Sequence, residues 1–473
     1  MANPTSVSPE ARRKIIRVLV ISLLLDLWQV TDGLQISFTF ILPLFPRLIE
    51  FYRNLEAGRE DSNTVLNHIL QTLNAYKNSF ARPISGRYDV VLLGGALGSL
   101  FSCLQAIASP VIGTLSDRYG RRTALLWSMA GNLLSVALWV MATDFRTFLA
   151  SRVVGGLSEG NVQLAFAIAT DISDEKSRGS TMMLVGACFS VAFTFGPALG
   201  AALANITTVA ANPFATAAGF SLFLLGIETI YLYFCLPETL VSTSVPAPES
   251  TTSNGHVKGT KPSSHVRTNS HILLNSVHLI FLFFFSGVEF SLPFMTYDLF
   301  SYDSSQTGRL LGFIGFIAFI LQGFVTRRLH PLRSVQVGLL SLTVSFFLLG
   351  RVRTQTELYA AAALLAVTNA TVVTGLTSLS SFEAATNERG GKLGNHRSWG
   401  QVGRALGPLT FCSFYWWAGR ETTYRIGGAG MLGVCALVFG ALRAPPQAEE
   451  GSAPRKENRT PPSPPQAEEL KAA

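Results

Sequence analysis

Long apolar runs with few charges recur along the whole chain, and they limit the fold more than any other feature. Each run approaches the ~20 residues that an α-helix needs to cross the hydrocarbon core of a bilayer. Only 14% of the 473 residues are charged, against about a quarter in soluble chains. Backbone polar groups must pair within lipid, so such runs must be helical. We predict twelve membrane-spanning helices, at residues 15–46, 89–115, 123–142, 147–170, 179–203, 214–236, 272–296, 307–326, 334–350, 357–380, 397–417 and 424–443.

The first run is longer than one membrane span requires. As a single helix, residues 15–46 would extend over about 48 Å, whereas the hydrocarbon core is about 30 Å thick. The run also contains Asp26 and Gly33. Either the helix is kinked and overlong, or part of the run lies outside the membrane.

Two polar segments interrupt the series of apolar runs. Residues 47–88 form a loop, in which apolar side chains at helical spacing predict a short surface helix. These side chains are Val65, Leu66, Ile69, Leu70 and Leu73. The second segment is rich in Ser, Thr, Pro and Gly, which indicates a disordered linker. We predict a cytosolic N-terminus (1–14), a six-helix bundle (15–239), the linker (240–270), a second six-helix bundle (271–444) and a disordered cytosolic tail (445–473).

The basic residues predict the orientation of the chain. Short loops on one side of the predicted spans contain eleven Lys and Arg, and those on the other side contain five. The richer side is cytosolic by the positive-inside rule, which places both termini and the linker there. The net charge of +8 therefore belongs to loops, and we expect no nucleic acid partner. Asn205 begins an Asn-Ile-Thr tripeptide in an outer loop and is either a glycosylation acceptor or unused.

The strongest motif lies between the second and third predicted helices. Gly113 permits close helix approach, and Gly120 permits a tight turn. Asp117 can pair with a basic residue or a helix N-terminus, and the arginines can pair with Asp171 or Asp174. Such bonds would hold the cytoplasmic face shut and break when it opens; the alternative is an ordinary basic loop. The predicted gate comprises Gly113, Asp117, Arg118, Gly120, Arg121, Arg122 and Asp171.

Small residues and prolines recur at matching places in the two halves. Gly196, Pro197 and Gly200 fall in the fifth predicted helix, and Gly407 and Pro408 fall in the eleventh. We expect them to bend these helices and to pack them closely against neighbours. A weaker copy of the gate motif at 323–328 also occupies the matching place in the second half. This recurrence indicates two repeats of one six-helix unit.

These motifs resemble those of a known family. The form G-x-x-x-D-R-x-G-R-R at 113–122 resembles the signature of the major facilitator superfamily, and 196–200 resembles an element of its antiporters. Further stretches at 155–162, 285–290 and 318–331 are similar to the tetracycline-transporter-like group of its drug:proton antiporter branch. The resemblance implies an all-α membrane protein with twelve helices in two bundles, acting as a monomer. It also implies organic anions or amphipathic drug-like solutes as substrates, and protons as a coupling partner.

Charged and amide groups within the apolar runs are the candidate transport residues, because they are costly in lipid. Proton coupling needs a carboxylate that can be neutral or charged, and the alternative for each is a structural ion pair. The candidates for coupling are Asp26, Glu159, Glu228 and Glu289. Arg152, Gln105 and Arg404 are candidates for a substrate cavity, although Arg152 is alternatively an arginine that reaches the membrane surface.

We therefore predict a secondary active transporter that works by alternating access. Two alternatives stay open: a facilitator or symporter of a neutral solute such as a sugar, and a scaffold or receptor that does not transport. An enzyme is not expected, since the chain has no P-loop and its histidines lack metal-ligand or triad spacing. We expect no cofactor and no metal. The protein is multi-pass, in the plasma membrane or an endomembrane, including the nuclear envelope.

Overall fold

The fold, a computed structural model, is entirely helical in its described residues, which are 8–29, 51–52, 64–79, 88–174, 177–188, 191, 215–240, 268–302 and 304–445. Eight helices in this part of the chain are long and apolar enough to cross a membrane. The helices are α1 (Pro9–Gln29), α3 (Val65–Asn78), α4 (Tyr88–Tyr119), α5 (Arg121–Val140), α6 (Phe145–Ser158), α7 (Asn161–Asp171), α9 (Ala215–Cys235), α10 (His271–Phe300), α11 (Ser304–Ile320), α12 (Pro331–Arg351), α13 (Gln355–Glu383), α14 (Arg389–Ala418) and α15 (Arg420–Ala441).

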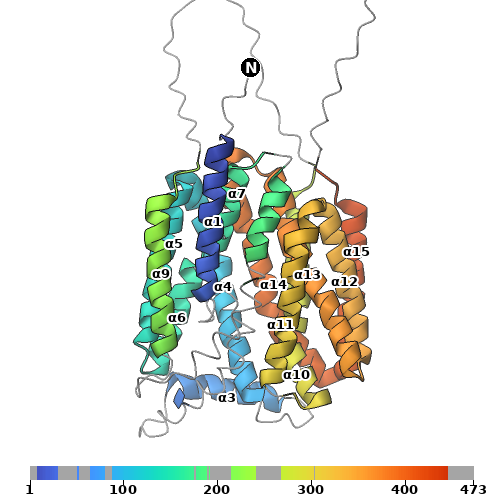
Figure 1. The fold of residues 1–473 in the computed structure, drawn as a ribbon. Helices are drawn as coiled ribbons and strands as arrows, with labels where there is room; N and C mark the ends of the chain where they lie inside the picture. The colour runs from blue at the N-terminus through green and yellow to red at the C-terminus, as the bar shows by residue number, and fades with distance from the viewer. Residues whose placement is uncertain are drawn as a thin grey trace, which may run out of the picture.

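The helices form two groups, α1 to α9 and α10 to α15, which meet at α4 and α14 in the centre of the molecule (Figure 1). One cluster of buried apolar side chains is built from α10 to α15, with Leu92 of α4 added. Three further clusters are built from residues that precede residue 237. The buried apolar side chains thus fall into an earlier and a later part of the chain, which meet at α4 and α14.

Glycines allow the backbones of α4 and α14 to touch. A Cβ atom on Gly113 of α4 would lie 2.2 Å from the carbonyl oxygen of Gly390 on α14. A Cβ atom on Gly394 of α14 would lie 2.4 Å from the carbonyl oxygen of Ser109. No side chain fits in these gaps, so the crossing depends on glycine at both positions.

The predicted fourth helix is not continuous. The expectation of one helix over 147–170 is wrong, because α6 ends at Ser158 and α7 begins at Asn161. Ser128 of α5 enters the gap, where its hydroxyl donates to the Ser158 carbonyl and accepts from the Gly160 N–H at 2.8 Å. The side chain of another helix therefore replaces helical hydrogen bonds and leaves Glu159 at the break.

Several other boundaries differ from the apolar runs. α4 continues to Tyr119, and α14 begins eight residues earlier than the run at 397–417, because polar contacts extend both helices beyond the apolar part. The predicted eighth helix ends in a π-helical turn (Leu321–Val325) and a 3₁₀ turn (Thr326–Arg328). α1 begins at Pro9 and is described as far as Gln29.

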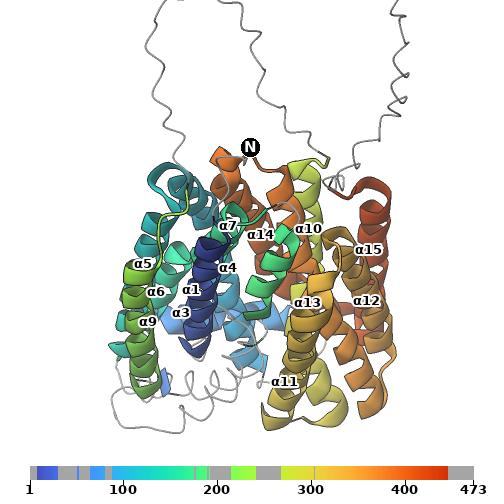
Figure 2. The same ribbon diagram turned by 45° about the horizontal axis from the view of Figure 1, so that its top comes forward.

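The short helix predicted between the first two runs is confirmed as α3. The Thr64 side chain caps it by accepting from the Asn67 N–H at 3.3 Å, and Leu66 and Leu70 are its buried residues. α3 lies across the end of the molecule opposite the N-terminus (Figure 1); in the tilted view of Figure 2 this end is turned away and α3 lies behind the other helices.

Several predicted features fall outside the described residues. Residues 241–267 of the predicted linker (240–270) and residues 446–473 of the predicted tail (445–473) are among them. So are the candidate packing residues Gly196, Pro197 and Gly200 and the candidate glycosylation residue Asn205. The division of the chain into these five segments stays a prediction.

Candidate functional site

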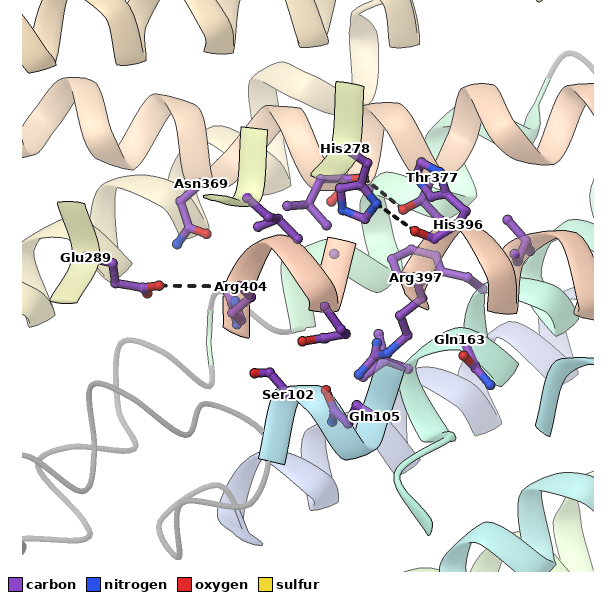
Figure 3. A pocket seen from close by; sticks show the side chains of 18 of the residues that line it. Ser102, Gln105, Gln163, His278, Glu289, Asn369, Thr377, His396, Arg397 and Arg404 are labelled. Carbon is purple, nitrogen blue, oxygen red and sulfur yellow. Dashed lines mark hydrogen bonds and ion pairs between the residues drawn. The ribbon is translucent and has the colours of Figure 1, made fainter. Parts of the chain in front are cut away.

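A cavity of about 190 Å³ lies between the two groups of helices. It is lined by α4, α7, α10, α13 and α14, together with Gly186 and Gln322. Much of its wall is polar, which is unusual inside a membrane helix bundle and marks a candidate substrate path. The larger polar side chains in the wall are Gln105, Gln163, His278, Glu289, Gln322, Asn369, His396, Arg397, Gln401 and Arg404 (Figure 3).

An ion pair stands at one end of the cavity. Arg404 Nη2 of α14 lies 3.6 Å from Glu289 Oε2 of α10 (Figure 3). Both residues were predicted from the sequence, and the fold brings them together across 115 residues of chain. The pair sits in the wall and retains partial exposure, at 14% for the Glu289 side chain and 27% for Arg404. A carboxylate in this position can exchange its arginine partner for a proton.

Two stacked histidines occupy another part of the wall. The rings of His278 and His396 lie 4.2 Å apart and nearly parallel. His278 Nδ1 donates to the His396 carbonyl at 3.0 Å, and His396 Nδ1 donates to Asn275 Oδ1 at 2.9 Å. Both Nε2 atoms are buried without a hydrogen bond in the described residues. The pair is not evident from the sequence, because only the packing of α10 against α14 joins the two residues.

Arg397 is the second arginine of the cavity and was also missed. It lies seven residues before Arg404 on α14, so the two side chains share a face of that helix. Figure 3 shows Arg397 between Gln105 of α4 and the two histidines. The i, i+7 spacing of Arg397 and Arg404 in a predicted span was the available sequence signal.

Three predicted residues do not line this cavity. Arg152 is buried and packs over the rings of Trp139, at 5.1 Å, and Phe148, at 5.3 Å. Glu228 accepts from the Ser22 hydroxyl at 2.6 Å. Glu159 is buried at the break between α6 and α7. The sequence does not show which face of a helix points into the cavity, because that depends on how the neighbouring helices pack. Gln105 does line the cavity, and the side chain of Asp26 lies outside the described residues.

The residues of the predicted gate form one polar network. Arg121 Nε lies 2.7 Å from Asp171 Oδ2, and its Nη1 lies 2.7 Å from Asp117 Oδ1. Asp117 also accepts from the backbone N–H groups of Gly390 and Gly391, at 2.8 and 2.6 Å. These groups belong to the N-terminus of α14, where a carboxylate is favoured by the exposed N–H groups and the helix dipole.

A second contact joins the same two groups of helices. Arg389 Nη1 of α14 lies 3.1 Å from Asp171 Oδ1 at the end of α7. Asp171 therefore binds one arginine from each group of helices. Asp117 likewise binds Arg121 and the N-terminus of α14, so two carboxylates connect the groups at this end.

The remaining gate residues hold the turn between α4 and α5. Gly120 has a φ of 98°, which favours glycine, and a Cβ atom there would lie 2.3 Å from Glu238 Oε2. Arg122 donates to the Tyr233 carbonyl at 2.6 Å, and Arg118 lies over the Tyr119 ring at 5.3 Å. These contacts stay within the earlier group of helices.

The packing residues predicted in the eleventh run lie on α14 against α10. A Cβ atom on Gly407 would lie 2.3 Å from the Phe283 carbonyl oxygen. Pro408 follows it inside α14. The two helices therefore pack closely next to the Glu289–Arg404 pair.

Comparison with known proteins gives consistent matches. Residues 64–408 match the family model of the Major Facilitator Superfamily. The mouse major facilitator superfamily domain-containing protein 10 is 32% identical over 449 residues, which cover 89% of this chain and 92% of that protein. The class E tetracycline resistance protein of Escherichia coli is 27% identical over 350 residues, covering 72% of this chain and 82% of that protein.

A solved structure matches over most of the chain. The crystal structure of the human organic anion transporter MFSD10 (TETRAN) superposes with a TM-score of 0.78 at 31% sequence identity. The match covers 91% of this chain and all of that one.

Proposed function

Because the chain belongs to the major facilitator superfamily, and so is a multi-pass membrane transporter rather than an enzyme, we propose that it moves organic anions by alternating access. The expected resemblance to the tetracycline-transporter-like group is confirmed by these relatives. The proposal includes twelve spanning helices in two bundles, over 15–239 and 271–444. The eight apolar helices of the described residues and their two sets of buried cores support it.

The charge of the cavity wall is the observation that best supports organic anions as the substrate class. The wall contains two guanidinium groups, of Arg397 and Arg404, and one carboxylate, of Glu289. With neutral histidines, the side chains of the wall have a net charge of +1, which an anionic solute would balance. A solved relative is titled an organic anion transporter, which supports the same class.

The polar network of α4, α7 and α14 supports alternating access. Asp117 and Asp171 each bridge the two groups of helices. We assign Gly113, Asp117, Arg121 and Asp171 to a gate that closes the predicted cytoplasmic end of the cavity. Opening that end requires these bonds to break while the two bundles rock about the substrate.

Proton coupling is assigned to Glu289. A proton on this carboxylate would release Arg404, and a charged carboxylate would hold it. When a proton replaces Arg404 as the partner of Glu289, the positive charge that the cavity presents to the substrate changes, which links proton binding to substrate binding. Glu159 and Glu228 do not line the described cavity and are less suited to this role.

Uptake into proteoliposomes tests the proposal. The full-length protein is reconstituted, with the lumen either more acidic than the bath or at equal pH. Carboxyfluorescein uptake is then measured by lysing the proteoliposomes in buffered detergent. Because a proton on Glu289 frees Arg404 and makes the cavity more positive, an anion and a proton should move together, so uptake should exceed that of protein-free liposomes and should be slower with the acidic lumen. An uptake rate that does not change with the pH gradient would rule out proton coupling but would leave anion transport standing. Uptake no greater than in empty liposomes would remove both.

A neutral solute is the second candidate, and the amides of the wall favour it. Gln105, Gln163, Gln322, Asn369 and Gln401 all line the cavity and can bind hydroxyl groups. Competition separates the candidates: benzoate and other anions should block carboxyfluorescein uptake, whereas glucose should not. Block by glucose alone would favour the neutral solute, and the absence of any stabilising ligand in a thermal screen would favour a scaffold.

A further inference from the structure

The two arginines of the cavity are in different situations. Arg404 already has the Glu289 carboxylate within 3.6 Å. Arg397 has no hydrogen bond and no ion pair with any residue in the described part of the chain, and its Nε is buried without a partner. A guanidinium that faces a cavity in this way is costly inside a membrane protein, and an anion in the cavity would satisfy it.

The groups across the cavity from Arg397 suit a specific kind of anion. Gln163 donates its Nε2 to the Ser109 carbonyl at 3.0 Å, and a carbonyl can only accept, so the orientation of this amide is fixed. Its Oε1 is buried without a partner. It therefore offers an acceptor for a hydroxyl or N–H of the solute. Phe166 and Leu282 add apolar wall for the organic body.

A nearby carboxylate competes for Arg397. Glu159, at the break between α6 and α7, attracts the Arg397 guanidinium electrostatically from the other group of helices. In the empty cavity this attraction partly balances the charge of Arg397. A bound anion would take over that role, so removing the charge of Glu159 should favour the anion.

Resting on the proposed function, we propose that Arg397 binds the anionic group of the substrate, and that the substrate is an organic carboxylate or sulfonate carrying a hydroxyl or N–H donor for Gln163. Arg404 stays with Glu289 and serves proton coupling. The two arginines of α14 thereby divide substrate recognition and coupling between them, and Arg397 sets the specificity for charge.

Two dyes with the same ring system test this assignment. Carboxyfluorescein is an anion with carboxylates and phenolic oxygens, and rhodamine 123 is a cation whose carboxylate is blocked as an ester. Binding to the purified full-length protein is measured by fluorescence anisotropy, and transport by counterflow. Arg397→Gln should weaken carboxyfluorescein binding by about tenfold or more, the range of a hydrogen bond to a charged group, and should raise KM more than it lowers the maximal rate. Rhodamine 123 binding should not weaken.

Three variants serve as comparisons. Arg404→Gln, on the same face of α14, should change carboxyfluorescein affinity by less than Arg397→Gln. Glu159→Gln should tighten it. Arg397→Lys should bind more weakly than the wild type, because an ammonium cannot form the paired bonds of a guanidinium. If Arg397→Gln does not elute as a folded monodisperse protein, Arg397→Lys decides, and affinity equal to wild type would overturn the assignment.

The outcomes separate this inference from the proposed function. If the wild type transports carboxyfluorescein and Arg397→Gln binds it equally well, the assignment of Arg397 is overturned and anion transport stands. If the wild type binds rhodamine 123 in preference to carboxyfluorescein, both are overturned. A selective loss of the anionic dye in Arg397→Gln supports both.

Discussion

At the scale of single residues, two kinds of charge pair stand out in this sparsely charged chain. Arg121 is fully buried and paired with Asp117 and Asp171, whereas Glu289 and Arg404 meet in the cavity wall. The first arrangement fixes structure. The second leaves a carboxylate whose partner can change, which is what coupling requires.

Glu289→Gln tests that carboxylate. The amide cannot take up or release a proton, so carboxyfluorescein uptake should no longer be slowed by an acidic lumen, while a basal exchange remains. The measurement is uptake into proteoliposomes at equal and unequal pH. Glu421→Gln is the matched control, because Glu421 pairs with Arg425 at the surface, outside the cavity. Slowing by the acidic lumen that persists in Glu289→Gln would argue against the assignment.

Gly113→Ala tests the helix crossing at the gate. The added methyl group would meet the Gly390 carbonyl, so the gate should close less completely and the transport rate should fall several-fold. Gly312→Ala is the control, since nothing lies within 4 Å of a Cβ atom there. Counterflow of carboxyfluorescein measures both. Equal rates for Gly113→Ala and the wild type would show that close contact here is dispensable.

At the scale of elements, sequence patterns located the helices but not their interruptions. Hydropathy is a property of one segment, and it found α4, α9, α12 and α15 to within a few residues at most ends. The break at Glu159 depends on Ser128, and the start of α14 depends on Asp117, which is 273 residues from Gly390. The His278–His396 pair likewise exists only after α10 packs against α14, so no local pattern contains it.

α3 shows how a surface element attaches to the bundle. The Tyr76 hydroxyl donates to the Leu409 carbonyl of α14 at 3.2 Å and also contacts Ser413, and its ring packs on Trp416. Burial raises the pKa of Tyr76, so the hydroxyl keeps its proton and stays a donor at neutral and mildly alkaline pH. α3 thus ties the loop after the first run to the later group of helices.

Tyr76→Phe removes that tie without removing the ring. The lost hydrogen bond is worth about 1 kcal/mol, so hydrogen exchange in α3 should accelerate by roughly fivefold, measured by mass spectrometry. Gln71→Ala, at an exposed position of the same helix, should leave exchange near the wild-type rate. Unchanged exchange in Tyr76→Phe would show that ring packing alone holds α3.

At the scale of the whole molecule, the two groups of helices are joined at both ends of the cavity. Asp117 and Asp171 join them at the end rich in arginine, and α3 bridges to α14 at the other (Figure 1). Transport by alternating access requires these joints to open in turn. A covalent bond across one of them should therefore stop transport without touching the cavity.

Thr114 and Gly391 offer the site for such a bond. A Cβ atom on Gly391 would lie 3.4 Å from Thr114 Oγ1 and 4.0 Å from its Cα, so the two positions are neighbours across the gate, as a disulfide requires. The most direct test is carboxyfluorescein counterflow by the Thr114→Cys, Gly391→Cys double variant, with the five native cysteines replaced. We predict that oxidation abolishes counterflow and that reduction restores it, whereas either single variant transports in both conditions. Undiminished counterflow with the bond fully formed would contradict alternating access through this gate.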